Sequence, residues 1–208
     1  MILTKGMLDT FVLIWTILAI PVFFILLKIG TPYGRFVRKG WGKLIDSRWG
    51  FLLIEFTAPF LFLALFLVYT LKYRIINIPI IAFLIIWEST YIYRALIYPA
   101  FRRKQKGIPI LTILASIIFN TINVFLIVTS IFLAEEIYSL SWLWDPRFII
   151  GLIIFTVGHA INIKSDIILG KLRKHEDYQI PKGFLFDYVS SPHYFGEIIK
   201  WIGFAILI

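Results

Sequence analysis

Apolar residues in this chain fall into long runs that are hydrophobic on every side, without the alternation expected of a half-buried strand. About 20 such residues are needed for a helix to cross a hydrocarbon core about 30 Å thick. The pattern therefore predicts an all-α fold, a polytopic transmembrane helical bundle. The six expected spans are Leu8–Leu27, Phe51–Leu71, Ile78–Phe101, Ile108–Leu133, Arg147–Ile163 and Tyr194–Ile208.

The last apolar run is shorter than the others. It leaves about 15 residues between Tyr194 and Ile208, and a helix of that length, rising about 1.5 Å per residue, does not cross the hydrocarbon core. We interpret residues 1–208 as a single transmembrane domain whose sixth span is truncated. The fifth run, in contrast, is expected to continue as a helix beyond its apolar part, through Asn162 and Asp166 to Arg173.

Composition and charge support a membrane protein. The chain has 208 residues, of which 60% are hydrophobic, and a formal net charge of +9. Lys and Arg gather in three of the connections, Lys28–Trp49, Arg102–Gly107 and Lys171–Lys182, while the connection after the fourth span is acidic. The positive-inside rule then places the N-terminus outside and these three loops in the cytoplasm. Topology thus accounts for most of the charge, and no nucleic-acid partner is expected.

Residue types that carry metals are scarce. The chain has no cysteine, which excludes disulfides and thiolate metal sites, and its 3 histidines are scattered along the sequence. No metal site is therefore expected. Neither a dinucleotide-binding glycine motif nor a P-loop is present, so neither soluble nucleotide-binding fold applies.

Polar side chains inside the apolar runs are the candidate site residues. With the predicted orientation they all fall at one level, near the cytoplasmic end of their spans. They are Glu55, Tyr91, Arg94, Asn162, Asp166, His193 and Glu197. Six of them form pairs within one span, three or four residues apart, and each pair therefore shares one helix face. Because an isolated carboxylate in hydrocarbon is costly, we expect Glu55 to be either paired or protonated. We expect the acid and the imidazole of Glu197 and His193 to face a bound polar ligand.

Each residue taken alone also fits a structural role. Glu55 could pair with Arg94 to join two helices, and Tyr91 could belong to the interfacial aromatic belt. Asn162 and Asp166 could cap or link helices, and His193 could be an ordinary satisfied polar group. Outside this level, Asn120 is expected to form a hydrogen bond between helices. The shared level, rather than any single residue, favours a functional site.

Three segments make the chain resemble a known family. They read TYIYRALIYPAFRR at Thr90–Arg103, NIKSDIILGKLRK at Asn162–Lys174 and YQIPKGFLFDYVSSPHYFGEIIKWIGFA at Tyr178–Ala205. The chain resembles the steroid 5-alpha-reductase family of membrane enone reductases, which includes polyprenol and very-long-chain enoyl reductases. The resemblance implies seven spans, NADPH bound on the cytosolic side, and reduction of a carbon–carbon double bond next to a carbonyl. It also implies that the family's last span and tail are missing here.

The resemblance assigns roles to individual residues. Glu55 and Tyr91 match the pair that polarises the substrate carbonyl. Positions that match the NADPH site are Arg94, Arg103, Lys106, Asn123, Asn162, Asp166, Arg173, Tyr178, His193, Glu197 and Trp201. Among these, Arg103 and Lys106 match cofactor phosphate contacts. Gly170 and Gln179 depart from the pattern, because they stand where the family has arginines.

The expected partners are an apolar small molecule, such as a steroid, polyprenol or enoyl lipid, and the membrane itself, with the chain acting as a monomer. Two other functions remain open. A membrane methyltransferase of the isoprenylcysteine type would use S-adenosylmethionine, but its RHPxYxG order differs from Ser191-Pro192-His193-Tyr194. A transporter or assembly subunit would place polar groups through the full depth of the bilayer rather than at one level.

Overall fold

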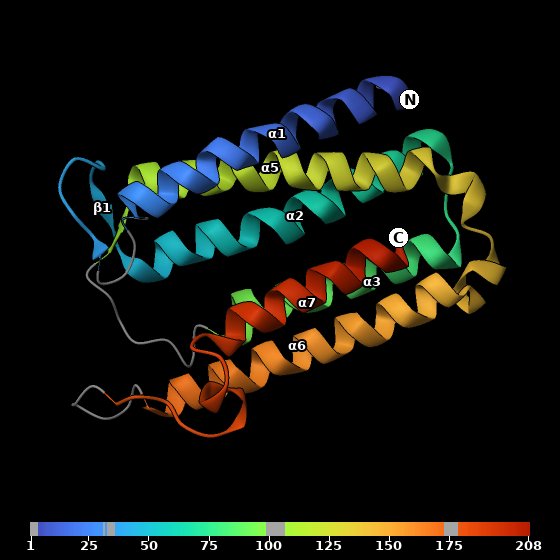
Figure 1. Ribbon diagram of the computed structural model, residues 1–208. Helices are drawn as coiled ribbons and strands as arrows, with labels where there is room; N and C mark the ends of the chain where they lie inside the picture. Colours follow the sequence, from blue (N-terminus) through green and yellow to red (C-terminus); the bar gives the residue numbers. More distant parts are fainter. Residues whose placement is uncertain (1–3, 31, 33–35, 99–106, 173–178) are drawn as a thin grey trace. The chain divides into compact units, whose positions relative to one another are not determined.

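The described part of the protein is mostly helical, as the apolar runs predict. The computed structural model describes residues 4–30, 32, 36–98, 107–172 and 179–208 (Figure 1). Its long elements are α1 Lys5–Ile29, α2 Ser47–Tyr73, α3 Ile78–Ile92 with the π-helix η2 Tyr93–Ile97, α5 Ile110–Leu133, α6 Pro146–Leu172 and α7 Pro192–Leu207. Within these described ranges, five helices are long and apolar enough to span a membrane, with α3 and η2 counted together. The chain is therefore an integral, multi-pass membrane protein.

The sixth expected span is the helix α7. It has 16 residues and starts at Pro192, two residues before the predicted Tyr194. The fifth is confirmed as one continuous helix, because α6 carries Asn162 and Asp166 and ends at Leu172.

Polar caps set where several helices begin. The side chain of Asp46 accepts a hydrogen bond from the backbone N–H of Arg48 at 2.9 Å and so starts α2 four residues before the predicted Phe51. Asn77 caps α3 in the same way, with its Oδ1 2.9 Å from the backbone nitrogen of Ile80. Such caps satisfy backbone N–H groups that have no partner inside the helix. The apolar runs thus predicted the spans but not their first turns.

One predicted boundary is wrong. The fourth span does not begin at Ile108, because Ile108–Pro109 form the strand β2, which pairs antiparallel with β1 at Leu44–Ile45. Apolar composition does not distinguish a short buried strand from the start of a helix, which explains the error. The third span is helical from Ile78 as predicted and changes at Tyr93 into the π-helix η2, and its predicted end at Phe101 lies outside the described residues.

The chain forms two compact units. The first comprises Met1–Ile76 with Lys104–Glu136, and so holds α1, α2, α5 and the β1–β2 pair. Its core lies between α2 and α5, where the rings of Phe66 and Tyr69 meet Phe132 edge-to-face at 5.6 and 5.4 Å. The Tyr69 hydroxyl lies 3.0 Å from the Thr129 hydroxyl. Asn120 donates from its Nδ2 to the Ile54 carbonyl at 3.1 Å, which confirms the predicted bond between helices.

The second unit comprises Asn77–Arg103 with Ile137–Ile208, and so holds α3, η2, α6 and α7. Figure 1 shows α6 and α7 side by side along their lengths. Their contact is made by backbone rather than by large side chains. A Cβ added to Gly158 of α6 would lie 2.3 Å from the backbone nitrogen of Lys200, and one added to Gly203 of α7 would lie 2.3 Å from that of Phe155. Gly151 and Gly196 make equivalent backbone contacts seven residues, or about two turns, earlier on α6 and α7 respectively.

Candidate active site

An ion pair joins η2 to α7 in the second unit. The guanidinium of Arg94 contacts the carboxylate of Glu197, and both side chains are only partly exposed. A second cation approaches the same carboxylate, because the Lys200 ammonium lies 3.8 Å from Glu197 Oε1. Arg94 and Glu197 are among the residues predicted from the sequence as cofactor contacts, and Lys200 is not. A signal for Lys200 was present, since it lies three residues after Glu197 in an apolar helix.

Two side-chain hydrogen bonds join α6 to η2 and α7 in the second unit. The Tyr93 hydroxyl donates to Asp166 Oδ2 at 3.4 Å, which joins η2 to α6. Asn162 Nδ2 donates to the His193 carbonyl at 3.0 Å, which joins α6 to the first turn of α7. Asp166 and Asn162 are both buried. Tyr93 was not among the predicted residues; it became a partner of Asp166 only through the fold.

The π-helix places these polar side chains. A π-turn inserts an extra residue into the helical repeat and so changes the direction of the residues that follow it. Here η2 begins at Tyr93, directly after Tyr91 and Ile92, and carries both Tyr93 and Arg94. Consecutive residues on η2 therefore reach different helices, with Tyr93 bound to α6 and Arg94 bound to α7.

An aromatic cluster lies beside the ion pair. The Trp87 ring is 5.3 Å from the Tyr91 ring and 5.1 Å from the Trp201 ring, measured between centroids. Tyr91 and Trp201 are 6.3 Å apart, and Phe204 completes the group at 5.9 Å from Trp201. Tyr91 and Trp201, predicted from distant parts of the sequence, are thus brought together on α3 and α7.

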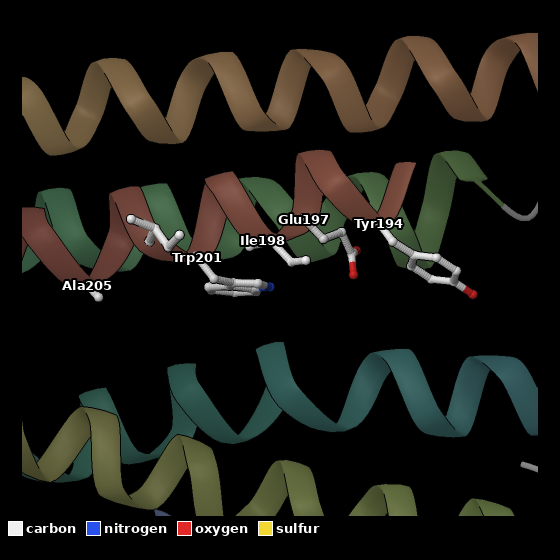
Figure 2. Close-up of a pocket in the computed structure, with 6 residues that line it drawn as sticks. Tyr194, Glu197, Ile198, Trp201 and Ala205 are labelled. Atoms are coloured by element: carbon white, nitrogen blue, oxygen red, sulfur yellow. The ribbon is translucent and has the colours of Figure 1, made fainter. Parts of the chain in front are cut away.

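A hollow follows one face of α7. Its lining residues are Tyr194, Glu197, Ile198, Trp201, Ile202 and Ala205. Figure 2 shows the labelled side chains projecting from the same side of the helix. Their spacing of three and four residues explains this shared face. The surface is mostly apolar, with one carboxylate and one indole available to orient a ligand, which is the usual character of a small-molecule site.

Two of the predicted residues, Glu55 and Asn123, belong to the first unit. Glu55, in the third turn of α2, is buried with 6% of its surface exposed. Asn123 of α5 accepts a hydrogen bond from the Trp15 indole N–H at 3.0 Å and donates to its own helix at the Phe119 carbonyl, also at 3.0 Å. Both ends of the Asn123 amide are thus engaged within the unit, in a link between α1 and α5. The predicted Arg103, Lys106, Arg173 and Tyr178 lie outside the described residues.

Known proteins are similar in sequence to this chain along most of its length. The chain is 34% identical over 204 residues to mouse 3-oxo-5-alpha-steroid 4-dehydrogenase 1, an alignment that covers 96% of this chain and 78% of the mouse protein. The chain belongs to the 3-oxo-5-alpha-steroid 4-dehydrogenase family. The family's sequence model, described as 3-oxo-5-alpha-steroid 4-dehydrogenase, matches residues 106–208. The resemblance predicted from the three motifs is confirmed.

Similarity to this family extends to plants. Steroid 5-alpha-reductase DET2 of Gossypium hirsutum is 33% identical over 199 residues, which cover 92% of this chain and 75% of the plant protein. The human 3-oxo-5-alpha-steroid 4-dehydrogenase 1 is 44% identical over 119 residues, 56% of this chain and 45% of the human protein. Membership makes the chain an enzyme, an oxidoreductase of this family, and implies a nicotinamide cofactor.

The described residues fit the nicotinamide end of such a cofactor. A nicotinamide carries a flat aromatic ring and a carboxamide that donates and accepts hydrogen bonds. The Trp201 indole offers a flat surface at the hollow, and the Glu197 carboxylate accepts hydrogen bonds there. Asn162 Oδ1 is a buried acceptor without a hydrogen-bond partner among the described residues, and such buried acceptors are rarely left unused.

Proposed function

We propose that the protein reduces the carbon–carbon double bond of an apolar enone or enoyl lipid, with NADPH as the hydride donor. A 3-oxo-4-ene steroid is the first candidate substrate, because the mouse relative is named 3-oxo-5-alpha-steroid 4-dehydrogenase 1. The observation that carries the proposal is the Glu197 carboxylate, which pairs with Arg94 and lines the hollow of α7 together with Trp201, whose ring lies 6.3 Å from that of Tyr91. This arrangement combines a flat aromatic surface, a fixed carboxylate and a phenol in one small region.

Reduction of an enone places negative charge on the carbonyl oxygen. Hydrogen-bond donors that are already oriented in a low-dielectric site stabilise that charge strongly. We assign this task to Tyr91, whose phenol donates, and to Glu55, whose protonated carboxyl group also donates. The supporting observations are that Glu55 is buried and that the Tyr91 ring packs beside the rings of Trp87 and Trp201. The α-carbon then takes a proton from solvent or from a relay through the site.

The cofactor supplies the hydride, and the protein supplies binding and orientation. Glu197 would accept a hydrogen bond from the carboxamide and Trp201 would support the ring, while Asn162 is proposed as a cofactor contact on the family pattern. Asp166 is held by Tyr93, and Asn162 holds the first turn of α7 through the His193 carbonyl. Arg94 pairs with the Glu197 carboxylate from η2. Arg103, Lys106, Arg173 and Tyr178 are proposed to contact the rest of the cofactor, and His193 and Asn123 remain proposed on the family pattern alone.

The topology proposed with this function has the N-terminus outside and the cofactor on the cytoplasmic side. It is supported by the clustering of Lys and Arg in the connections Lys28–Trp49, Arg102–Gly107 and Lys171–Lys182. An apolar substrate would reach the site from the lipid, and the enzyme would act as a monomer.

The test is NADPH consumption by the purified protein in lipid nanodiscs, with a 3-oxo-4-ene steroid, an enoyl thioester and a polyprenol-like enone as substrates. We expect turnover with at least one of them. The variant Tyr91→Phe should lower kcat by about 100-fold or more, as expected for loss of an oriented donor to developing charge. Glu55→Gln should cost less, about tenfold, because a Gln amide still donates a hydrogen bond.

Matched controls separate this role from general damage. Tyr73→Phe and Glu136→Gln make the same chemical changes at the end of α2 and in the exposed connection after α5, and both should keep the wild-type rate. If Tyr91→Phe and Glu55→Gln also keep it, the assignment of the two donors is wrong. If the protein binds S-adenosylmethionine and not NADPH, measured by quenching of tryptophan fluorescence, the reductase proposal itself fails.

A further inference from the structure

Lys200 is a cation in an unusual place. It lies in the middle of α7, and none of its surface is exposed. Its backbone packs against α6 at Gly158, where a side chain on the glycine would collide with the Lys200 nitrogen. Lysine is almost never fully buried unless its charge is paired, and inside a membrane protein such a residue usually serves function.

Glu197 is the carboxylate that faces this ammonium. Lys200 Nζ lies 3.8 Å from Glu197 Oε1 and 5.1 Å from the centroid of the Trp201 ring. On the other side, the same Oε1 accepts from Arg94 of η2. The two cations are not equivalent, because 31% of the Arg94 side chain is exposed and none of the Lys200 side chain is.

This difference in burial gives the two cations different tasks. A partly exposed guanidinium can exchange its carboxylate for water or for a ligand, whereas a fully buried ammonium has no water to turn to. The Glu197–Lys200 contact also lies within a single helix, at a spacing of three residues, so it forms wherever α7 forms. Lys200 is therefore the permanent partner of Glu197, and Arg94 is the exchangeable one.

We propose that Lys200 is a positioning residue. Its ammonium fixes the Glu197 carboxylate at the hollow of α7, where the carboxylate can accept a hydrogen bond from the carboxamide N–H of a nicotinamide cofactor. The cofactor part of this inference rests on the proposed function. The ion-pair part does not, and it can be tested in protein without cofactor. Lys200 is the only lysine or arginine on α7.

The first experiment is a double-mutant cycle on thermal unfolding of the cofactor-free protein in nanodiscs. Glu197→Gln leaves the buried ammonium without its carboxylate, and we expect the midpoint to fall by about 6 °C or more. Adding Lys200→Met to that variant removes the buried charge that has lost its carboxylate, so the double variant should unfold at a higher temperature than Glu197→Gln alone. A double variant equal to or less stable than Glu197→Gln, or one that cannot be recovered folded, overturns the inference.

The second experiment measures cofactor use. Lys200→Met should raise the KM for NADPH by about tenfold while kcat changes by less than about threefold, because a misplaced carboxylate weakens binding more than it alters the reacting groups. The control Lys72→Met removes an exposed lysine at the end of α2 and should change neither constant. An unchanged KM in Lys200→Met overturns the positioning role. A wild-type protein without NADPH turnover overturns the proposed function instead, and the unfolding cycle still decides the ion pair.

Discussion

The helix pair α6–α7 and the helix pair α2–α5 are both made of long apolar runs, yet they are held together by different means. Between α6 and α7, glycines bring the two backbones into direct contact at four positions, Gly151, Gly158, Gly196 and Gly203. Between α2 and α5, large rings fill the space, with Phe66, Tyr69 and Phe132 meeting edge-to-face. Lipid tails are as apolar as these side chains, so close packing and hydrogen bonds, rather than hydrophobic burial, drive both contacts.

The difference determines how much each pair can tolerate. A backbone contact has no side chain that can move aside, whereas a contact between rings can relax when one ring is trimmed. The glycine contact also serves the candidate site, because it places Asn162 within 3.0 Å of the His193 carbonyl and holds Lys200 next to Gly158. Damage to the α6–α7 contact should therefore reach the residues proposed to bind NADPH, whereas trimming the rings of Phe66, Tyr69 or Phe132 should act mainly on stability.

The largest effect is expected from Gly158→Ala. The added Cβ would lie 2.3 Å from the backbone nitrogen of Lys200 and 2.7 Å from the Gly196 carbonyl oxygen, so the two helices must separate. We expect a loss of about 4 kcal/mol or more in stability, at the upper end of overpacking effects, together with loss of NADPH binding. Thermal unfolding and fluorescence titration measure the two losses. Gly6→Ala is the matched control, because nothing lies within 4 Å of its Cβ position; equal stability of the two variants would contradict the close contact.

A smaller effect is expected from Phe132→Ala in the α2–α5 pair. Phe132 is fully buried and contacts the rings of Phe66 and Tyr69, so truncation leaves a cavity that costs about 3 kcal/mol. NADPH affinity should stay within about threefold of wild type, because Phe132 does not line the hollow of α7. A tenfold loss would correspond to about 1.4 kcal/mol of binding free energy. The same truncation at Phe60, whose ring is 59% exposed, should be nearly neutral. A large loss of NADPH binding in Phe132→Ala would remove the proposed contrast between the two pairs.

The third change removes a single hydroxyl from the α2–α5 pair. Tyr69→Phe loses the contact with the Thr129 hydroxyl at 3.0 Å and leaves that group buried, which should cost about 1 kcal/mol. Tyr73→Phe makes the same change one turn further along α2, where the hydroxyl has no hydrogen-bond partner among the described residues. That variant should be as stable as wild type or slightly more stable. The difference between their unfolding midpoints measures the hydroxyl pair, and a difference of zero would show that the pair contributes nothing.

The smallest effect concerns the exposed start of α6. Hydrogen bonds from the Arg147 side chain and backbone lower the pKa of the Asp145 carboxyl to about 2. A lowered carboxyl pKa stabilises the folded state above the unfolded value near 3.8, and this contribution is lost as the pH falls toward 2. Replacing the cation with Arg147→Met should slightly lower the unfolding midpoint at pH 5. The two proteins should converge near pH 2, and a difference that persists there would show that packing of Arg147 on Trp142, rather than the carboxylate, is responsible.

Much of the fold could be predicted because its cause is local. Runs of about 20 apolar residues predict membrane helices whatever surrounds them, and the five long helices confirm this. Arg94 and Glu197 were both predicted as site residues from the sequence, but the ion pair between them was found only in the structure. The assigned roles of Glu55 and Tyr91 in catalysis stay predictions that activity measurements must decide.

Other features depend on contacts between segments that are distant in sequence. The start of the fourth helix was misplaced because Ile108–Pro109 pair with Leu44–Ile45, about 60 residues earlier. Tyr93 was overlooked because its value as a partner of Asp166 depends on the π-helix that redirects it toward α6. Lys200 was overlooked because a lysine in an apolar helix could equally well extend to the membrane surface, and only the packing of α6 shows that it does not.

The sequence by itself determined that this protein is a membrane helical bundle of the 3-oxo-5-alpha-steroid 4-dehydrogenase family, because hydrophobic length and family motifs are properties of the chain alone. Only the tertiary structure decided which helices touch through glycine, which cation is buried and which is exposed, and which polar groups share a carboxylate. Those outcomes depend on the distance and angle between helices, and both are set by side chains packing from separate segments.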